Sequence, residues 1–370
     1  MAKFGSNRKT GSKGTFPLDD PNVSKAVDPG GMISAVEGFA DQAREGWDLA
    51  AGVKMPCSIK DIDQILVCGM GGSAIAGDLI RCYLRDAFKK PVLVNREYTL
   101  PAWVGKRTLV VASSYSGNTE ESLAAYSQAC QKKAKILAIT TGGDLAKKTA
   151  KAKQTQVAIP GGLQPRAALG YGFFPLLRVL DNSKWIPSQK KAMAETLDLL
   201  AKTCRMFALK RPTNLNPAKK VAVSLAGKLT VVYAASDPYE AVATRWRGQL
   251  EENAKVLAFC HTLPEMNHNE IVGWEHDPGL WKKIHVILLR DPEAEHPRTA
   301  LRFQVIRRLL KGKPGQLTPI TAKGKGLLAR TFFLINFGDF TSVYLAYLNK
   351  QDPTPVAPIA KLKKVLASKK

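Results

Sequence analysis

The chain has 370 residues, of which 45% are hydrophobic and 23% charged, and no segment approaches the roughly 20 consecutive apolar residues that a membrane helix needs. This length is sufficient for two domains with separate cores. The 55 lysines and arginines against 31 acidic residues give a net charge of +24, but the basic residues are spread over both halves of the chain. We therefore expect a basic surface that attracts an anionic substrate, and neither nucleic acid nor a membrane as a partner.

The N-terminal segment, residues 1–17, is basic and lacks the apolar stretch of a signal peptide, so we expect a disordered tail and no secretion. The six cysteines show no C-x-x-C spacing, and several of them lie within apolar runs. Such a distribution is typical of reduced cysteines in a protein core. These features together predict a cytoplasmic protein.

After the tail, apolar residues at helical spacing predict one amphipathic helix over Met32–Val53. Short apolar runs then alternate with helical patterns up to residue 159. The predicted strands are Ile65–Cys68, Pro91–Val94, Thr108–Ala112, Ile136–Thr140 and Gln156–Ile159, and the predicted helices are Ala74–Leu84, Thr119–Lys132 and Leu145–Lys151. This alternation predicts an α/β fold with a doubly wound parallel sheet.

The first predicted strand, Ile65–Cys68, runs into a turn that contains Gly69, Gly71, Gly72 and Ser73. Open parallel sheets bind their ligands beside such turns, at the carboxyl ends of the strands. The helix that follows offers free backbone N–H groups at its N-terminus, which attract anions. This turn is therefore the first candidate for an anion site.

The third predicted strand is followed by a second turn, which is rich in hydroxyl groups. These hydroxyls belong to Ser113, Ser114, Ser116 and Thr119. Asn118, with Glu121 three positions later, fits a capping box and predicts the start of the next helix at that point. Since both turns follow neighbouring strands, we expect them to hold one phosphate between them.

The segment Pro160–Pro165 interrupts the alternation, so we place a domain boundary there. Residues 18–165 are predicted as the first domain, and residues 166–370 as linking helices, a second doubly wound domain and a C-terminal helix. The predicted linking helices are Ala167–Val179 and Gln189–Leu209, followed by strands Leu229–Ala234 and His285–Leu289 and helices Tyr239–Lys255, Arg298–Leu310 and Leu327–Leu348. The turn at Ser236 lacks the glycines and the hydroxyl cluster, so we expect one phosphate site per chain.

Six motifs follow one another along nearly the whole chain. They are Gly69–Ser73 (GMGGS), Ser114–Thr119 (SYSGNT), Gly161–Tyr171 (GGLQPRAALGY), Glu252–Asn253, Pro264–Trp274 (PEMNHNEIVGW) and Asp352–Pro355 (DPTP). Taken together and in this order, the motifs resemble those of the bifunctional phosphoglucose/phosphomannose isomerases, which contain two sugar isomerase (SIS) domains. The first two motifs occur in any SIS domain, whereas the four later ones together are far more specific.

The resemblance implies reversible conversion of glucose 6-phosphate, and commonly mannose 6-phosphate, to fructose 6-phosphate. It implies no metal and no organic cofactor. It also implies a homodimer whose active site lies at the subunit contact, with the histidine supplied by the neighbouring chain. Because the two aldoses differ only at C2 and share one enediol, rotation about the C2–C3 bond would make both of them substrates.

Moving a proton between C1 and C2 requires a positioned base and a cation beside the developing oxyanion. The resemblance aligns Glu252 with the family's glutamate, so we expect it to be the base. His268 lies in a polar turn, and an imidazole side chain can pass a proton to or from the ring oxygen, which suits it to opening the sugar ring. Arg166 follows the loop after the first domain and is the candidate cation for the enediolate. A solvated helix carboxylate, a surface histidine and a structural arginine are the alternatives for these three residues.

The remaining site residues come from the turns and from the C-terminal helix. The expected phosphate and sugar ligands are Gly72, Ser73, Ser114, Ser116, Thr119 and Thr354. Lys363 fits the family's C-terminal lysine best, with Lys361 and Lys364 as alternatives within one helical turn. Glu251 departs from the family pattern, because an asparagine is expected before the catalytic glutamate.

Four other functions compete with this interpretation. One is a glucose-6-phosphate isomerase without the mannose activity, and another is a non-catalytic SIS regulator that binds a sugar phosphate. A dinucleotide enzyme is suggested by G-x-G-x-x-A from Gly69 to Ala74, but Asn95 and Arg96 stand where an acidic ribose ligand is expected. A metal-dependent isomerase would need a ligand set that the chain does not offer at compact spacing, the nearest being His261, Glu265, His268 and His276.

Overall fold

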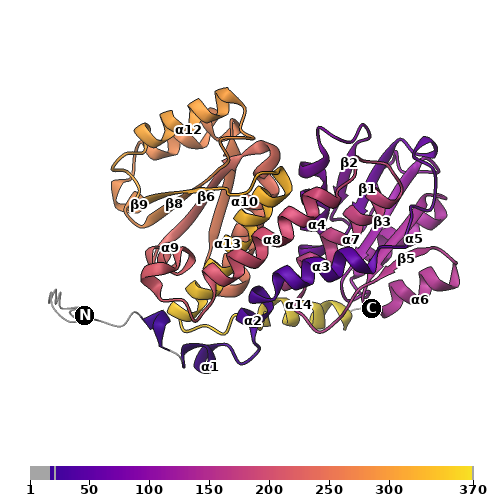
Figure 1. Ribbon diagram of the computed structural model, residues 1–370, viewed down its shortest axis with the longest axis horizontal. Coiled ribbons are helices and arrows are strands. Elements are labelled where there is room, and N and C mark those ends of the chain that lie inside the picture. Colours follow the sequence, from indigo (N-terminus) through magenta and orange to yellow (C-terminus); the bar gives the residue numbers. More distant parts are fainter. Residues whose placement is uncertain (1–16, 21, 369–370) are drawn as a thin grey trace.

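The computed structural model describes residues 17–20 and 22–368, so all of the predicted N-terminal tail except Pro17 lies outside the described residues. The described strands form two parallel sheets, in the orders β2-β1-β3-β4-β5 and β7-β6-β8-β9. Helices cover both faces of each sheet (Figure 1). The predicted α/β class, with two doubly wound parallel sheets and flanking helices, is therefore confirmed.

The first sheet follows the apolar runs closely, because each run is long enough for one buried strand. Its strands are β1 (Gln64–Cys68), β2 (Val92–Asn95), β3 (Thr108–Ser114), β4 (Lys135–Thr140) and β5 (Thr155–Ala158), and its helices are α4 (Gly71–Leu84), α5 (Glu120–Gln131) and α6 (Gly143–Lys151). The strand ends lie within two residues of the predicted ones. Helix α4 begins three residues earlier than predicted, at Gly71, so the glycine-rich turn itself forms the helix start.

The second sheet repeats the layout of the first. Its strands are β6 (Leu229–Ala235), β7 (Ala258–Leu263), β8 (Ile284–Arg290) and β9 (Gln316–Thr321), and its helices are α9 (Pro217–Leu225), α10 (Ser236–Ala254), α11 (Pro278–Trp281), α12 (Pro297–Leu309), α13 (Leu327–Leu348) and α14 (Ala357–Ala367). The order β7-β6-β8-β9 matches β2-β1-β3-β4. Consequently β6 occupies the place of β1, and α10 the place of α4.

Further helices lie before the first sheet and between the two sheets. They are α1 (Val23–Val27), α2 (Met32–Glu37), α3 (Phe39–Leu49), α7 (Leu169–Asn182) and α8 (Lys190–Phe207). Short 3-10 turns connect the elements: η1 (Pro17–Asp19), η2 (Ile59–Asp61), η3 (Pro165–Ala167), η4 (Thr213–Leu215), η5 (Glu265–His268) and η6 (Glu270–Trp274). In the described chain, no helix is both long enough and apolar enough to cross a bilayer.

One continuous hydrophobic core joins the inner faces of the two sheets. It contains Val67 and Val111 from the first sheet, Val232 and Ile287 from the second, and the helices between them, including α13 (Figure 1). Two smaller cores lie under the outer helices, one beneath α5 and α6 and the other beneath α12. Alternate residues of each buried strand therefore face different cores, which explains the unbroken apolar runs in the sequence.

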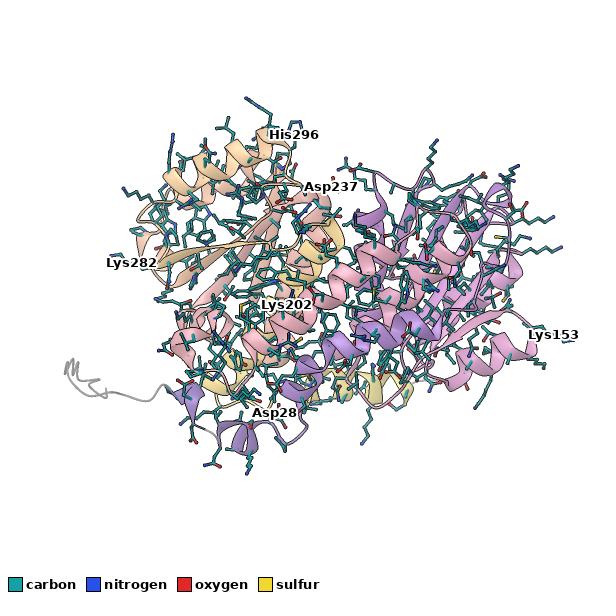
Figure 2. The ribbon with its side chains drawn as sticks, in the orientation of Figure 1. Asp28, Lys153, Lys202, Asp237, Lys282 and His296 are labelled. Carbon is teal, nitrogen blue, oxygen red and sulfur yellow. The ribbon has the colours of Figure 1, made fainter. Side chains whose placement is uncertain are left out.

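The structure corrects the predicted helix over Met32–Val53. Two helices, α2 and α3, replace it, and Gly38 lies between them with its amide donating to the Ser34 carbonyl. Asp28, which lies near α1, α2 and the end of α13, accepts hydrogen bonds from the amides of Met32 and Ile33, both at 2.8 Å (Figure 2). The carboxylate thus satisfies two free N–H groups at the start of α2.

Four elements of the second half were not predicted: β7, β9, α9 and the short α11. Strands β7 and β9 form the two edges of the sheet and are only partly buried, so their sequences lack a continuous apolar run. Strand β9 even contains Pro319, which an edge strand tolerates because one side of its backbone has no partner. Apolar periodicity is a weak signal for such strands.

Candidate active site

The two predicted turns lie side by side at the carboxyl edge of the first sheet. Strands β1 and β3 are hydrogen-bonded neighbours, and a Cβ added to Gly69 would lie only 2.8 Å from the carbonyl oxygen of Ser113. Ser73 lies in the first turn of α4, directly beyond this contact. The backbone amides at the start of α4 therefore face the same region as the hydroxyl-rich turn.

Within the turn after β3, the hydroxyls hold the backbone in a tight loop. The buried Ser114 Oγ accepts a hydrogen bond from the amide of Gly117 at 3.1 Å and donates to Thr119 Oγ1 at 3.1 Å. Gly117 has a φ of 70°, which a residue with a side chain rarely adopts. Ser116 is exposed, and its Oγ accepts from the amide of Asn118 at 3.2 Å. Ser116 and Thr119 thus remain near the surface of this loop.

The predicted capping box at Asn118 and Glu121 is wrong. Helix α5 begins at Glu120 with Thr119 in the N-cap position, and no side chain caps it. The Asn118 side chain turns to the neighbouring helix instead, where its Oδ1 accepts from the amide of Asp144 at 2.9 Å. Asn118 therefore caps the start of α6, because tertiary contact brings that helix end closer than its own.

One cavity of about 280 Å³ brings three of the predicted site residues together. It is lined by Gly71 and Gly72 from α4, by Arg166 from η3, and by Glu251 and Glu252 near the end of α10. These residues come from both halves of the sequence. The cavity therefore lies between the two sheets, at the contact of α4 with α10.

Arg166 is buried and uses most of its hydrogen-bonding capacity to hold its position. Its Nε donates to Asn253 Oδ1 at 2.6 Å, and its Nη2 donates to the Thr354 carbonyl at 2.8 Å and to the Pro353 carbonyl. Its Nη1 donates to Glu252 Oε2 at 3.4 Å. A guanidinium has five N–H donors. The described contacts use four of them, so one remains for a ligand.

The backbone around Arg166 is fixed by two further side chains. The Nη2 of Arg245 donates to the Arg166 carbonyl at 3.0 Å, and the Nε2 of Gln42 donates to the Ala167 carbonyl at 2.8 Å. Arg245 is itself paired with the buried Asp339 at 2.7 Å. Burial raises the pKa of Asp339, and the charge of Arg245 opposes that rise. This buried pair from α10 and α13 supports the loop that carries Arg166.

Gly72 permits the close approach of the first turn to Arg166. A Cβ on Gly72 would overlap the carbonyl oxygen of Pro165 and lie 2.9 Å from its carbonyl carbon. We expect Gly72→Ala to destabilise the fold by about 1–3 kcal/mol, because backbone must shift, and to lower catalytic efficiency. Thermal unfolding and kinetics check this, with Gly52→Ala as control, since a Cβ at Gly52 meets nothing within 4 Å. Equal behaviour of the two variants would contradict the packing argument.

Five predicted ligands lie outside the cavity lining: Thr354, and four residues in or beside the two turns. These four are Ser73, Ser114, Ser116 and Thr119. Thr354 contributes its carbonyl to Arg166, but its side chain packs against Gly30, where an added Cβ would lie 2.7 Å from Thr354 Cβ. Its buried Oγ1 has no hydrogen-bond partner among the described residues.

Two predicted catalytic residues lie away from the cavity of their own chain. His268 is exposed at the end of η5, and Lys363 is exposed on α14. Neither lines the cavity. In residues 17–20 and 22–368, no group of three or more histidine, cysteine or acidic side chains is arranged to hold a metal.

Two residues that organise the site, Lys255 and Asp339, were not among the predicted ones. Lys255 donates to the carbonyl of Glu252 at 2.6 Å and to that of Pro355 at 2.7 Å. No sequence signal identifies it, because a lysine at a helix end is ordinary. Asp339 had a usable signal, since it is the one acidic residue within the long apolar run of α13. A buried carboxylate in an apolar helix indicates a paired partner.

Strand β8 of the second sheet holds the place that β3 holds in the first. In the turn after β8, a carboxylate accepts hydrogen bonds from neighbouring donors. The Glu295 carboxylate accepts from the amide of Asp291 at 2.8 Å and from two nitrogens of Arg290 at 2.8 and 2.7 Å. The Glu295 side chain is fully buried. The amide of Asp291 and the guanidinium of Arg290 are therefore already satisfied by the protein itself.

Comparisons with known proteins agree with this architecture. The family description "SIS domain" matches residues 58–160, and "Bacterial phospho-glucose isomerase C-terminal SIS domain" matches residues 214–366. A glucose-6-phosphate isomerase like protein from Thermus thermophilus has a similar structure, with a TM-score of 0.59 at 18% identity, covering 94% of this chain and 99% of that one. Fold and site thus define a protein with two SIS domains.

Two relatives give the family. A bifunctional phosphoglucose/phosphomannose isomerase of Caldicellulosiruptor bescii is 41% identical over 336 residues, covering 91% of this chain and 99% of the relative. Another, from Aquifex aeolicus, is 35% identical over 340 residues, covering 90% and 98%. The chain belongs to the bifunctional phosphoglucose/phosphomannose isomerase family, as the motifs predicted.

Proposed function

We propose that this protein interconverts glucose 6-phosphate and mannose 6-phosphate with fructose 6-phosphate through a cis-enediol. The observation that carries the proposal is the cavity in which Glu252 and Arg166 face Gly72 at the start of α4. A carboxylate, a cation and an anion-binding helix start are the three groups that the reaction needs. Membership of the isomerase family supports the same assignment.

In this proposal, Glu252 removes the proton from C2 of the aldose and returns it to C1 of the enediol. Arg166 stabilises the oxyanion that develops meanwhile, through the N–H that its protein contacts leave free. The hydroxyl proton moves from O2 to O1, so the reaction is balanced without a cofactor. The contact of 3.4 Å between Arg166 and Glu252 is loose enough for the carboxylate to act as a base.

The phosphate is assigned to the two adjacent turns of the first sheet. The backbone amides at the start of α4 and the side chains of Ser73, Ser114, Ser116 and Thr119 are its proposed ligands. Support comes from the contact between Gly69 and Ser113, which brings the two turns together. Anchoring the dianion there leaves C1 and C2 of the sugar free to reach Glu252.

Activity on both aldoses tests the proposed function directly. Purified protein should form fructose 6-phosphate from glucose 6-phosphate and from mannose 6-phosphate, because both give the same enediol. Thr354 is proposed to line the sugar, as the Asp352–Pro355 motif predicted, and its carbonyl oxygen accepts a hydrogen bond from Arg166 beside the cavity. Activity on glucose 6-phosphate alone would favour the monofunctional alternative, and binding without turnover would favour a sugar-phosphate regulator.

We further propose a homodimer in which His268 serves the active site of the neighbouring chain and opens the sugar ring. Its exposure, and its absence from the cavity of its own chain, support this arrangement. The assignment of the C-terminal lysine stays with Lys363 on the exposed helix α14, with Lys361 and Lys364 as alternatives. Separate Lys→Met variants at the three positions would identify the one whose loss lowers kcat.

A complementation experiment checks the shared site. His268→Ala and Glu252→Gln should each be nearly inactive, but a mixed dimer contains one site with both residues intact. When equal amounts of the two variants are refolded together or coexpressed, half of the dimers are mixed, and each mixed dimer has one intact site out of two. We therefore expect roughly a quarter of the wild-type activity. No gain above the separate variants would mean that His268 acts within its own chain or not at all.

The cellular setting and the domain division are proposed on sequence and structure together. All six cysteines are free, which supports work in the reducing cytoplasm. We keep residues 18–165 as the first domain and 166–370 as linking helices, second domain and C-terminal helix. Limited proteolysis near residue 165 tests that boundary.

A further inference from the structure

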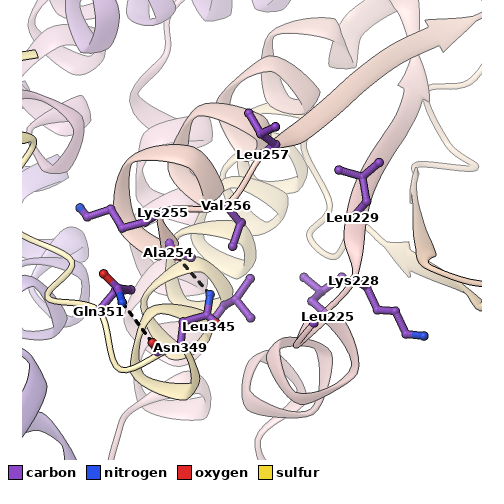
Figure 3. A pocket seen from close by; sticks show the side chains of 11 residues that line it. Leu225, Lys228, Leu229, Ala254, Lys255, Val256, Leu257, Leu345, Asn349 and Gln351 are labelled. Atoms are coloured by element: carbon purple, nitrogen blue, oxygen red, sulfur yellow. Dashed lines mark hydrogen bonds between the residues drawn. The ribbon is translucent and has the colours of Figure 1, made fainter. Parts of the chain in front are cut away.

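Lys255 lies directly after the last residue of α10, three positions beyond Glu252. Its φ is 58°, in the left-handed region that ends many helices. A neighbouring cavity of about 700 Å³ is lined by apolar residues such as Val256 and Leu345, and the Lys255 side chain points away from them (Figure 3). The ammonium is thus directed away from this cavity.

Three backbone carbonyls accept hydrogen bonds from the Lys255 ammonium. The Nζ donates to Glu252 O at 2.6 Å, to Pro355 O at 2.7 Å and to Pro353 O at 3.4 Å. An ammonium has three N–H donors, and each of them has an acceptor here. Lys255 therefore has no donor left for a substrate, which excludes it as a catalytic residue.

The turn 353–355, which supplies two of these three carbonyls, also holds the Arg166 guanidinium. Consecutive carbonyls of Pro353 and Thr354 accept from Arg166, while those of Pro353 and Pro355 accept from Lys255. One cation comes from η3 and the other from the end of α10. The turn 353–355 thereby joins the two elements that carry the proposed base and the proposed oxyanion cation.

The end of α10 has one more anchor. Asn349 Nδ2, just after α13, donates to the carbonyl of Ala254 at 3.1 Å (Figure 3). That bond fixes the helix to α13 but makes no contact with the turn 353–355. Burial lowers the pKa of Lys255, and the charge of Arg166 lowers it further. The carboxylates of Asp352 and Glu252 oppose this shift.

We propose that Lys255 is a positioning residue for the isomerisation: its ammonium ties the Glu252 end of α10 to the turn 353–355, and so sets the distance between Glu252 and Arg166. This inference rests on the proposed function. Loss of the ammonium frees the turn from α10, and a base displaced by a fraction of an ångström loses much of its rate. Binding of the phosphate, which lies at the other turns, should change little.

The test is steady-state kinetics of Lys255→Met on both aldose phosphates. We expect kcat to fall roughly 10- to 100-fold, equally for both, with KM changed far less. Lys255→Arg should restore most of the rate, since a guanidinium can reach the same carbonyls. Lys350→Met is the matched control: Lys350 also follows a helix with a φ of 54°, is exposed, and its side chain makes no hydrogen bond or ion pair in the described chain.

Lys255→Gly separates positioning from stability. Glycine favours the left-handed backbone, so this variant should unfold at no lower temperature than Lys255→Met, yet it should show the same loss of kcat. Unchanged kcat in Lys255→Met and Lys255→Gly, with an active wild type, would overturn the inference. A loss in kcat that follows unfolding temperature, or that Lys350→Met reproduces, would also overturn it. An inactive wild type would instead refute the proposed function.

Discussion

Replacing Glu252 by glutamine is expected to lower kcat by about 10³- to 10⁴-fold for both aldose phosphates, while KM changes little. The amide has nearly the same shape as the carboxylate but cannot accept the C2 proton. It can still contact Arg166, so the fold and the cavity should persist. Coupled assays of fructose 6-phosphate formation, together with a thermal unfolding curve, measure both parts of this prediction.

Glu251→Gln is the matched control, because Glu251 is the neighbouring carboxylate in the same cavity. Glu251 is partnered by Arg247 at 3.8 Å and lacks the contact with Arg166. Burial raises the pKa of Glu251, with the charge of Arg247 opposing it. The control should lose far less activity than Glu252→Gln. If Glu251→Gln were the more damaged variant, the base would have to be reassigned to Glu251.

Arg166→Lys should produce the second large effect. Lysine keeps the charge but has three donors, whereas Arg166 serves Asn253, Glu252 and two carbonyls of the turn 353–355. We expect kcat to fall about 10²- to 10³-fold through loss of oxyanion stabilisation. The unpaired buried acceptors should also lower the free energy of unfolding by about 1–3 kcal/mol. Kinetics and denaturant unfolding give the two values.

Arg247→Lys provides the comparison for that experiment. Arg247 lines the same cavity, but its described ion pair is the loose one to Glu251. Conservative replacement there should cost little stability and little rate. A variant Arg166→Lys with wild-type kcat would show that the charge alone suffices, and the argument from the fixed guanidinium geometry would fail.

The pattern of apolar runs was enough to predict the first sheet and its order of elements. Its three central strands, β1, β3 and β4, are almost entirely buried, and such strands appear in a sequence as short apolar runs. The edge strands β7 and β9 of the second sheet were not predicted, because much of their surface is exposed and apolar and polar residues are mixed along them. The break at Gly38 was missed for another reason: glycine is compatible with a helix, and only packing decides where the chain turns.

Local sequence also predicted the two turns rich in glycine and hydroxyl groups, which the structure places side by side at the carboxyl edge of the first sheet. Glycines and hydroxyls carry that chemistry within a few positions of one another, so no distant contact is needed to recognise them. Asn118 shows the limit of this reasoning. Its side chain satisfies whichever helix end lies nearest, and the tertiary structure brings α6, not α5, into reach.

The sequence by itself determined the alternating α/β class, the two turns that we propose for an anion and, through its motifs, the isomerase family. Only the tertiary structure decided that Arg166 and Glu252, 86 positions apart, share one cavity and a contact of 3.4 Å. It also revealed Lys255 and Asp339 as supports of that arrangement. The physical reason is that backbone carbonyls and buried charges bind the groups that lie nearest to them in space. The spacing of residues along the chain does not predict which groups those are.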